Sequence, residues 1–268
     1  MKRYLRLSLL LLPLLPAASP AAGAAPEGKQ PTEKQTSASH NNHRGPKQLM
    51  LENAEGAAIT LWKPDLTTLP LKPAHGGVTL PKTGMDNYHA VVAEKDWGNS
   101  KETVIRYEYM FGRPSKHSPS ELAGAVKTEL EIVPAPIPRE HFRYLSDQTW
   151  GFQVRLQGQP QADLPLILET EHGTRLQAVS DAQGYARFRL PDDFPDVVPG
   201  VRDQRSGEFS VSTSTQADGK TYQTLLSATY QLNPSHWQSA AMGWIVVGLG
   251  FIAGGLLGRQ KVRGGKTE

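Results

Sequence analysis

The chain has 268 residues, which is enough for one large domain or two small ones. It contains no cysteine, so disulfide frameworks, thiolate zinc sites, iron–sulfur clusters and cysteine nucleophiles are excluded. The net charge is +3, but residues 1–25 and 259–268 together hold seven cations and one acid, so the body between them is slightly acidic. This distribution argues against nucleic acid as a partner.

The first 25 residues have the pattern of a secretory signal peptide. Lys2, Arg3 and Arg6 precede an apolar stretch that contains Pro13 and closes with small residues. This stretch is shorter than the ~20 residues that a membrane span needs. We therefore expect cleavage near Ala24 or Ala25, followed by a disordered linker over residues 26–48, which lack any aliphatic or aromatic cluster.

Residues 240–257 contain no charge and would extend about 27 Å as a helix, close to the ~30 Å hydrocarbon core of a bilayer. The four cations of residues 259–268 follow directly, and the positive-inside rule places such a tail in the cytoplasm. We therefore expect a transmembrane helix over residues 237–258. The predicted localisation is the bacterial inner membrane, as a single-pass protein with its body in the periplasm and residues 259–268 as a cytoplasmic basic tail.

Four glycines of this segment share one helical face and would allow close approach of a membrane-protein partner; they are Gly243, Gly250, Gly254 and Gly258. Glycine stripes also occur in helices without partners. Specific helix pairing and its absence are therefore equal alternatives here.

Residues 49–133 are expected to form an N-terminal β domain, because four segments have strand composition and are separated by Gly, Pro and Asn. These segments are Ala57–Trp62, Tyr88–Ala93, Val104–Phe111 and Leu130–Val133. In the third segment, apolar residues from Ile105 to Phe111 alternate with Arg106 and Glu108. The alternation predicts that the apolar face lies on a core and the charged face does not.

The run from Pro134 to Pro138 predicts a stiff connector between two domains. Beyond it, residues 134–235 are expected to form a C-terminal β-sandwich. Trp150, Phe152, Val154 and Leu156 alternate with polar residues, and five further strand-like segments follow. The predicted fold class is mainly β, with two β-sandwich (immunoglobulin/transthyretin-like) domains plus one C-terminal transmembrane helix.

The segment Ser180–Gly184 lies between two of these strands, and we interpret it as a turn. The Asp181 carboxylate can accept hydrogen bonds from the turn amides, and Gly184 can adopt a positive φ. Residues 139–144, which follow the connector, mix charged and aromatic side chains. We interpret them mainly as interdomain packing, with a ligand cleft at the junction as the alternative.

Four segments of the chain resemble the NikM-like domain-of-unknown-function family of bacterial extracytoplasmic proteins, which is associated with nickel and cobalt uptake. They are Tyr88–Ala93, Leu130–Pro134, Leu156–Pro160 and Ser180–Gly184. The resemblance covers roughly residues 59–230. It implies a β-sandwich fold and a role in transition-metal uptake.

Five histidines are the candidate metal ligands: His89, His75, His117, His40 and His43. His89 lies on a predicted strand, and His75 and His117 lie in loops on either side of it in sequence. His40 and His43 form an i, i+3 pair in the linker. Without cysteine, imidazole with Asp or Glu is the remaining ligand set for a metal such as Ni(II) or Co(II). An ordinary surface or core role is the alternative for each histidine.

The sequence contains no G-x-S-x-G elbow, H-E-x-x-H pair, P-loop or dinucleotide fingerprint, so we expect no enzymatic activity. The leading hypothesis is a membrane-anchored periplasmic accessory or binding protein for transition-metal (nickel/cobalt-type) uptake. The alternative is a periplasmic adapter or assembly protein that binds no metal and uses the surfaces of its β-sandwich.

Overall fold

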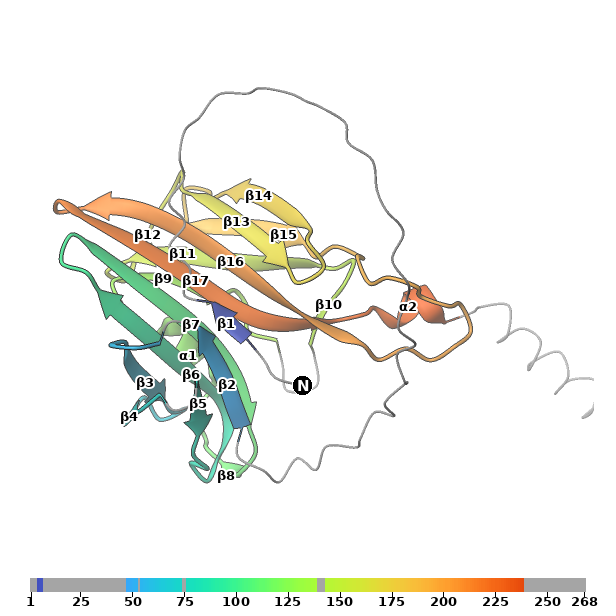
Figure 1. The fold of residues 1–268 in the computed structure, drawn as a ribbon, viewed down its shortest axis with the longest axis horizontal. Helices are drawn as coiled ribbons and strands as arrows, with labels where there is room; N and C mark the ends of the chain where they lie inside the picture. The colour runs from blue at the N-terminus through green and yellow to red at the C-terminus, as the bar shows by residue number, and fades with distance from the viewer. Residues whose placement is uncertain (1–3, 7–46, 53, 74–75, 139–142, 239–268) are drawn as a thin grey trace, which may run out of the picture.

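The computed structural model describes residues 4–6, 47–52, 54–73, 76–138 and 143–238, and almost all of their regular structure is β (Figure 1). The largest sheet has ten strands. Eight of them follow one path in the order β14 (Arg175–Val179), β13 (Pro165–Thr170), β16 (Ser206–Ala217), β17 (Lys220–Gln231), β7 (Ser100–Met110), β6 (Met85–Asp96), β3 (Ala58–Trp62) and β4 (Thr68–Leu71). The other two are β10 (Tyr144–Leu145), which pairs with β17, and β8 (Arg113–Pro114), which pairs with β6.

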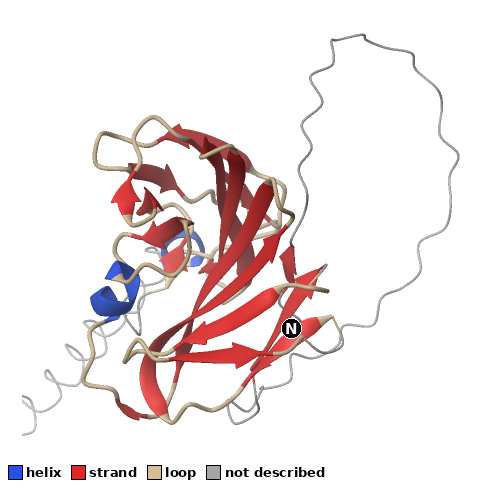
Figure 2. Cartoon of the chain, turned by 90° about the vertical axis from the view of Figure 1, so that its left-hand side faces the viewer, coloured by secondary structure: helices blue, strands red, loops and turns tan. Residues whose placement is uncertain are grey.

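Two smaller sheets lie against this large sheet. One has four strands, β12 (Gln159–Pro160), β11 (Thr149–Leu156), β15 (Tyr185–Arg189) and β9 (Leu130–Pro134). The other has three strands, β1 (Tyr4–Arg6), β2 (Lys47–Glu52) and β5 (Gly77–Leu80). The described residues also contain two short helices, α1 (Pro119–Gly124) and α2 (Pro234–Trp237) (Figure 2).

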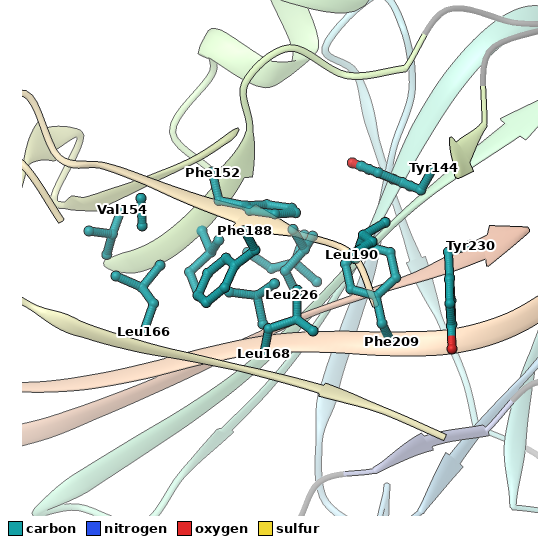
Figure 3. Packing of buried hydrophobic residues seen from close by; sticks show 14 of the residues in the cluster. Tyr144, Phe152, Val154, Leu166, Leu168, Phe188, Leu190, Phe209, Leu226 and Tyr230 are labelled. Atoms are coloured by element: carbon teal, nitrogen blue, oxygen red, sulfur yellow. The ribbon is translucent and has the colours of Figure 1, made fainter. Parts of the chain in front are cut away.

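Two hydrophobic cores occupy the spaces between the layers. The larger core includes Phe152 and Phe188 of the four-stranded sheet and Leu168, Phe209 and Leu226 of the large sheet (Figure 3). The four-stranded sheet thus packs face to face on the large sheet, as in a β-sandwich. The buried face predicted for β11 is confirmed, because Phe152 and Val154 are fully buried and Trp150 and Leu156 pack against the same core.

The second core lies on the opposite face of the large sheet, under β2 and β5. Leu49 of β2 and Val78 of β5 belong to the same cluster as Val91 of β6 and Val104 of β7. Val92 and Ile105, the next residues along β6 and β7, belong to the larger core. The central strands are therefore buried on both faces, which explains the continuous apolar run in β6.

The turn predicted at Ser180–Gly184 is confirmed. One carboxylate oxygen of Asp181 accepts hydrogen bonds from the amides of Gln183 (3.0 Å) and Tyr185 (2.9 Å), and Gly184 has φ 76°. A Cβ atom at Gly184 would lie 2.7 Å from the carbonyl oxygen of Val154, so glycine is required for sterics as well as for φ.

The large sheet contains strands from both sides of the connector predicted at residues 134–138. Strand β17, which lies after the connector, pairs in parallel with β7, which lies before it, from Thr221↔Ser100 to Ser227↔Arg106. The two long hairpins β6–β7 and β16–β17 consequently lie side by side (Figure 1). The two halves of the chain are thus joined by main-chain hydrogen bonds as well as by the connector.

The predicted C-terminal transmembrane helix and the single-pass inner-membrane localisation need correction. Trp237 is the last residue of α2, which has four residues and ends at Gln238 because that residue is extended (φ −69°, ψ 122°). Within the described ranges, no helix is long and apolar enough to cross a membrane. Residues 239–268, with the four glycines of the predicted stripe, lie outside the described residues, as does most of the predicted signal peptide.

The predicted orientation of β7 is also wrong at its C-terminal end. Arg106 and Glu108, on the face predicted to lie away from the core, are 1% and 4% exposed, whereas Phe111 just beyond the strand is 70% exposed. The charged face is buried because Glu208 of β16 and Lys47 of β2 supply opposite charges to it. Neither partner is close to β7 in sequence.

Candidate functional site

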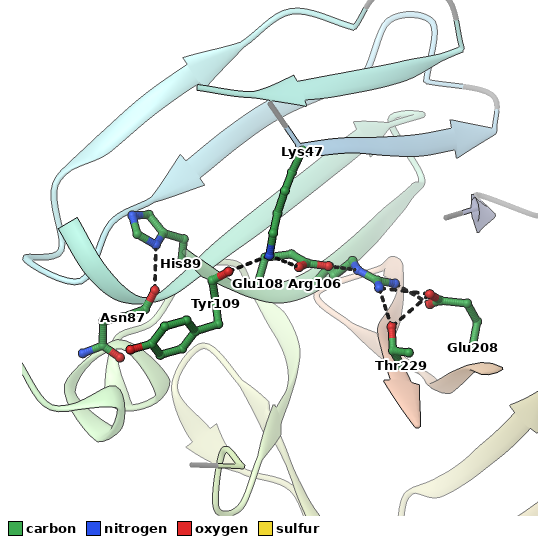
Figure 4. Close-up of polar contacts among 8 residues, drawn as sticks. All are labelled: Lys47, Asn87, His89, Arg106, Glu108, Tyr109, Glu208 and Thr229. Atoms are coloured by element: carbon green, nitrogen blue, oxygen red, sulfur yellow. Dashed lines mark hydrogen bonds and ion pairs between the residues drawn. The ribbon is translucent and has the colours of Figure 1, made fainter. Parts of the chain in front are cut away.

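His89, the central residue of the predicted metal site, is fully buried on β6. Its Nε2 lies 2.7 Å from the Thr83 hydroxyl, and its Nδ1 lies 3.1 Å from the Asn87 carbonyl oxygen. Burial lowers the pKa of His89. The imidazole is therefore favoured in its neutral form, but both of its nitrogens already have protein partners. Figure 4 shows the contact with Asn87.

The structure brings the His117 backbone close to the start of β6. The side-chain amide of Asn87, a residue with φ 142°, donates to the His117 carbonyl oxygen at 2.7 Å. The His117 imidazole, however, lies 2.9 Å from the Glu121 carboxylate, which is part of the capping box of α1. His89 and His117 thus belong to neighbouring segments but bind separate partners.

No group of three or more His, Asp or Glu side chains that could hold a metal ion occurs among the described residues. The remaining candidates, His40, His43 and His75, lie outside the described residues. The metal site therefore stays a prediction.

A cleft of about 370 Å³ lies where β7 and β17 separate. The parallel pairing of these strands ends at Arg106 and Ser227, and β17 then continues beside β10, with Tyr230 opposite Tyr144. We call this cavity the fork cleft. It is lined by Lys47, Tyr88, Arg106, Tyr107, Glu108, Tyr109, Phe111, Pro134, Ile137, Pro138, Arg143, Tyr144, Ser206, Leu226, Ser227, Ala228, Thr229 and Gln231.

Arg106 bridges the two strands at the base of the fork (Figure 4). Its Nε donates to Glu108 at 2.6 Å, and its two terminal nitrogens donate to Glu208 at 2.5 and 3.1 Å. The same nitrogens donate to Ser227 at 2.8 Å and Thr229 at 2.9 Å. These five bonds use all five N–H donors of a guanidinium group, so Arg106 is a structural bridge rather than a free ligand-binding group.

Two carboxylates compensate the loss of solvation that Arg106 suffers on burial. Burial alone lowers the pKa of this guanidinium, but Glu108 and Glu208 raise it well above its ordinary value. Lys47 extends the network, because its Nζ donates to Glu108 at 3.0 Å and to the Tyr109 carbonyl oxygen at 2.5 Å. The base of the cleft is thus held by four charged residues from three strands of two sheets.

Aromatic rings form one wall of the fork cleft. Tyr88 of β6 and Tyr109 of β7 face each other in register, with ring centroids 5.3 Å apart, and Phe111 contacts Tyr109 at the same distance. The Tyr109 hydroxyl donates to Asp86 at 2.7 Å, which fixes its ring. The side chain of Phe111 is the most exposed of the three and lies at the end of this row.

Sequence reasoning gave a cleft at this junction as an alternative, but it did not identify the residues that form it. The alternation around Arg106 and Glu108 predicts a core on the other side of the strand, and the linker predicted over residues 26–48 includes Lys47. The available signal was the unusual density of Tyr and Phe in residues 107–111 together with the charges between them. The contribution of Glu208 and Thr229 had no local signal, because they lie more than 100 residues away.

No protein-family model matches this chain, and no curated protein matches it. Solved structures similar to it include a Ca²⁺-stabilised adhesin by which an Antarctic bacterium binds ice, with 15% identity and a TM-score of 0.26. That match covers 69% of this chain and 41% of the adhesin chain. The D0–D1 domain of intimin is 10% identical, with a TM-score of 0.27, and the match covers 65% of this chain and 80% of that one.

Proposed function

We propose that this chain is a non-enzymatic binding module, an adapter that holds a partner in the fork cleft. The observation that supports the proposal is the combination of a cleft between two diverging strands, a wall of aromatic rings and a base of paired charges. Recognition sites favour a preformed concave surface with a few fixed polar groups. The five bonds of Arg106 provide that preformed geometry.

The chemistry of the cleft supports binding rather than catalysis. Glu108 is the acidic residue of the lining, and it accepts hydrogen bonds from both Arg106 and Lys47. General acid–base catalysis needs a side chain that can reach a proton of the substrate. The Glu108 carboxylate is instead held by two cations of the protein.

Site-specific photo-crosslinking tests this function. A photo-reactive phenylalanine analogue would replace Phe111 in the full chain, in the cells that produce it. The matched control carries the analogue at Val179, which is 58% exposed on the edge strand β14. We expect discrete adducts from position 111 and none from position 179. Equal adducts at both positions, or none at position 111, would overturn the proposal.

The metal-uptake role implied by the family resemblance remains a separate prediction. Equilibrium dialysis of the full chain against Ni(II) and Co(II) tests it, with His40→Ala/His43→Ala and His89→Ala as variants. If these histidines are ligands, the substitutions will weaken binding, and binding will fall below pH ~6.5 as imidazole is protonated. Unchanged binding in both variants would remove these residues from the site.

A further inference from the structure

The lining of the fork cleft carries a surplus of positive charge. It contains Lys47, Arg106 and Arg143 but one acidic residue, Glu108. Arg106 is fully hydrogen-bonded, and Lys47 has two acceptors and a half-exposed side chain. Arg143 is exposed, and no ion pair joins it to any residue in the described ranges. Arg143 is therefore the group that can meet a negative charge on an incoming ligand.

The apolar part of the lining consists of two groups of residues. The row Tyr88, Tyr109 and Phe111 supplies aromatic rings, and Pro134, Ile137 and Pro138 supply rigid aliphatic groups. Aromatic-lined grooves bind proline-rich segments, because extended polyproline geometry is preformed and loses little entropy on binding. The volume of about 370 Å³ lies at the low end of the ~300–1,000 Å³ typical of ligand pockets, so it suits a short segment rather than a domain.

We infer that the partner of the fork cleft presents a short, extended segment that contains proline and acidic residues. A proline ring packs against Phe111 and Tyr109, and a neighbouring carboxylate pairs with Arg143. The charge surplus selects against basic segments, because an added cation would face Arg143 and Lys47 without compensation. This inference rests on the proposed binding function and specifies its ligand.

Selection from a peptide library tests the ligand class. A library of random octapeptides displayed on phage is panned against the purified full chain, and selected peptides are resynthesised with a fluorescent label for anisotropy measurements. The variants are Arg143→Gln and Phe111→Ala, both at exposed positions, with Val179→Ala as the matched control.

We expect the selected peptides to be enriched in Pro and in Asp or Glu. Arg143→Gln should weaken their binding by about tenfold through loss of a charge-assisted contact, and Phe111→Ala by about fivefold through loss of ring packing. Val179→Ala should bind as the wild type does, and added salt should weaken binding. Neither added salt nor Arg143→Gln should affect the packing of the peptide proline against Phe111.

Several outcomes overturn the inference. One is the selection of basic peptides or of peptides without enrichment, and another is the absence of any selected peptide. A third is binding that Arg143→Gln and Phe111→Ala leave unchanged. If one of these occurs while the crosslinker at position 111 still forms adducts, the ligand class is wrong and the binding function stands. If the adducts are also absent, the binding function itself fails.

Discussion

Two buried ion clusters stabilise this molecule, and they balance their charges in different ways. At the fork cleft, Arg106 lies between the carboxylates of Glu108 and Glu208, and Lys47 supplies a second cation to Glu108. Below α1, one carboxylate lies between two cations: Glu131 is 3.1 Å from the Lys127 ammonium and 2.6 Å from the Arg155 guanidinium. The side chains of Lys127 and Glu131 are fully buried.

The surplus cation of the second cluster is compensated by backbone carbonyls. Lys127 donates to the Ala125 carbonyl oxygen at 2.6 Å, and Arg155 donates to those of Ala123 (2.7 Å) and Gly124 (3.2 Å). The last carbonyls of a helix lack partners inside it and carry partial negative charge. The first cluster therefore depends on ionised side chains from distant strands, whereas the second also uses the end of a nearby helix.

Completeness of hydrogen bonding separates the two clusters further. The guanidinium of Arg106 has five hydrogen bonds, but Arg155 Nε has no hydrogen-bond partner among the described residues. A buried polar network whose groups all have partners adds rigidity. In an incomplete network, the free energy of desolvating the unpaired groups is not compensated by hydrogen bonds. Arg106 should consequently be the more sensitive position.

Arg106→Met should have the largest effect. The variant leaves Glu208 without its cation and Glu108 with Lys47 alone, and breaking a buried pair in this way costs about 3–5 kcal/mol. Urea unfolding at pH 7 measures the loss. The control is Arg189→Met, whose ion pair with Asp147 is exposed and worth less than about 1 kcal/mol. A loss no larger than that of the control would show that the fork does not depend on Arg106.

Glu131→Gln should destabilise the protein by a smaller amount, about 2–3 kcal/mol, because Lys127 and Arg155 keep their carbonyl acceptors. The same urea experiment measures it. If Glu131→Gln costs as much as Arg106→Met, the helix carbonyls do not compensate the surplus cation, and the comparison between the clusters fails.

Lys127 offers a test of the second cluster through pH. Burial lowers the pKa of Lys127 in the folded state, whereas the unfolded chain retains a value near ~10.4. Between the two values the unfolded state binds more protons, so stability due to this group rises with pH in that window. The difference in unfolding free energy between wild type and Lys127→Met should therefore shift in favour of wild type as pH increases toward 10. A flat difference would contradict the lowered pKa.

His89 is a further buried titratable group, and it has no carboxylate within hydrogen-bonding distance among the described residues. Burial lowers the pKa of His89 in the folded state, so below pH ~6.5 the unfolded chain binds more protons than the folded chain. The free energy of unfolding therefore decreases as the pH is lowered. His89→Gln should reduce this loss when unfolding is measured between pH 7 and 5. Lys127→Met is the control, since its effect lies on the alkaline side. An identical acid profile in wild type and His89→Gln would remove His89 as the cause.

Local sequence patterns were sufficient for the outer parts of the sandwich. The alternation over residues 149–156 predicted the buried face of β11, which packs on the large core. It did not predict that Arg155, on the other face, is buried beside Glu131. The turn at Ser180–Gly184 was predictable from Asp181 and Gly184, since its hydrogen bonds lie within five residues. Both features depend on interactions that are close in sequence.

The interior of the large sheet depended on contacts that are far apart in sequence. The chain alone determined that residues 100–110 form a strand with alternating charged and apolar residues. Only the tertiary structure decided that its charged face is buried, because that choice requires Glu208, Thr229 and Lys47 to reach Arg106 and Glu108. A buried charge is stable only beside a compensating partner, and the partners here come from strands whose pairing is set by the whole sheet.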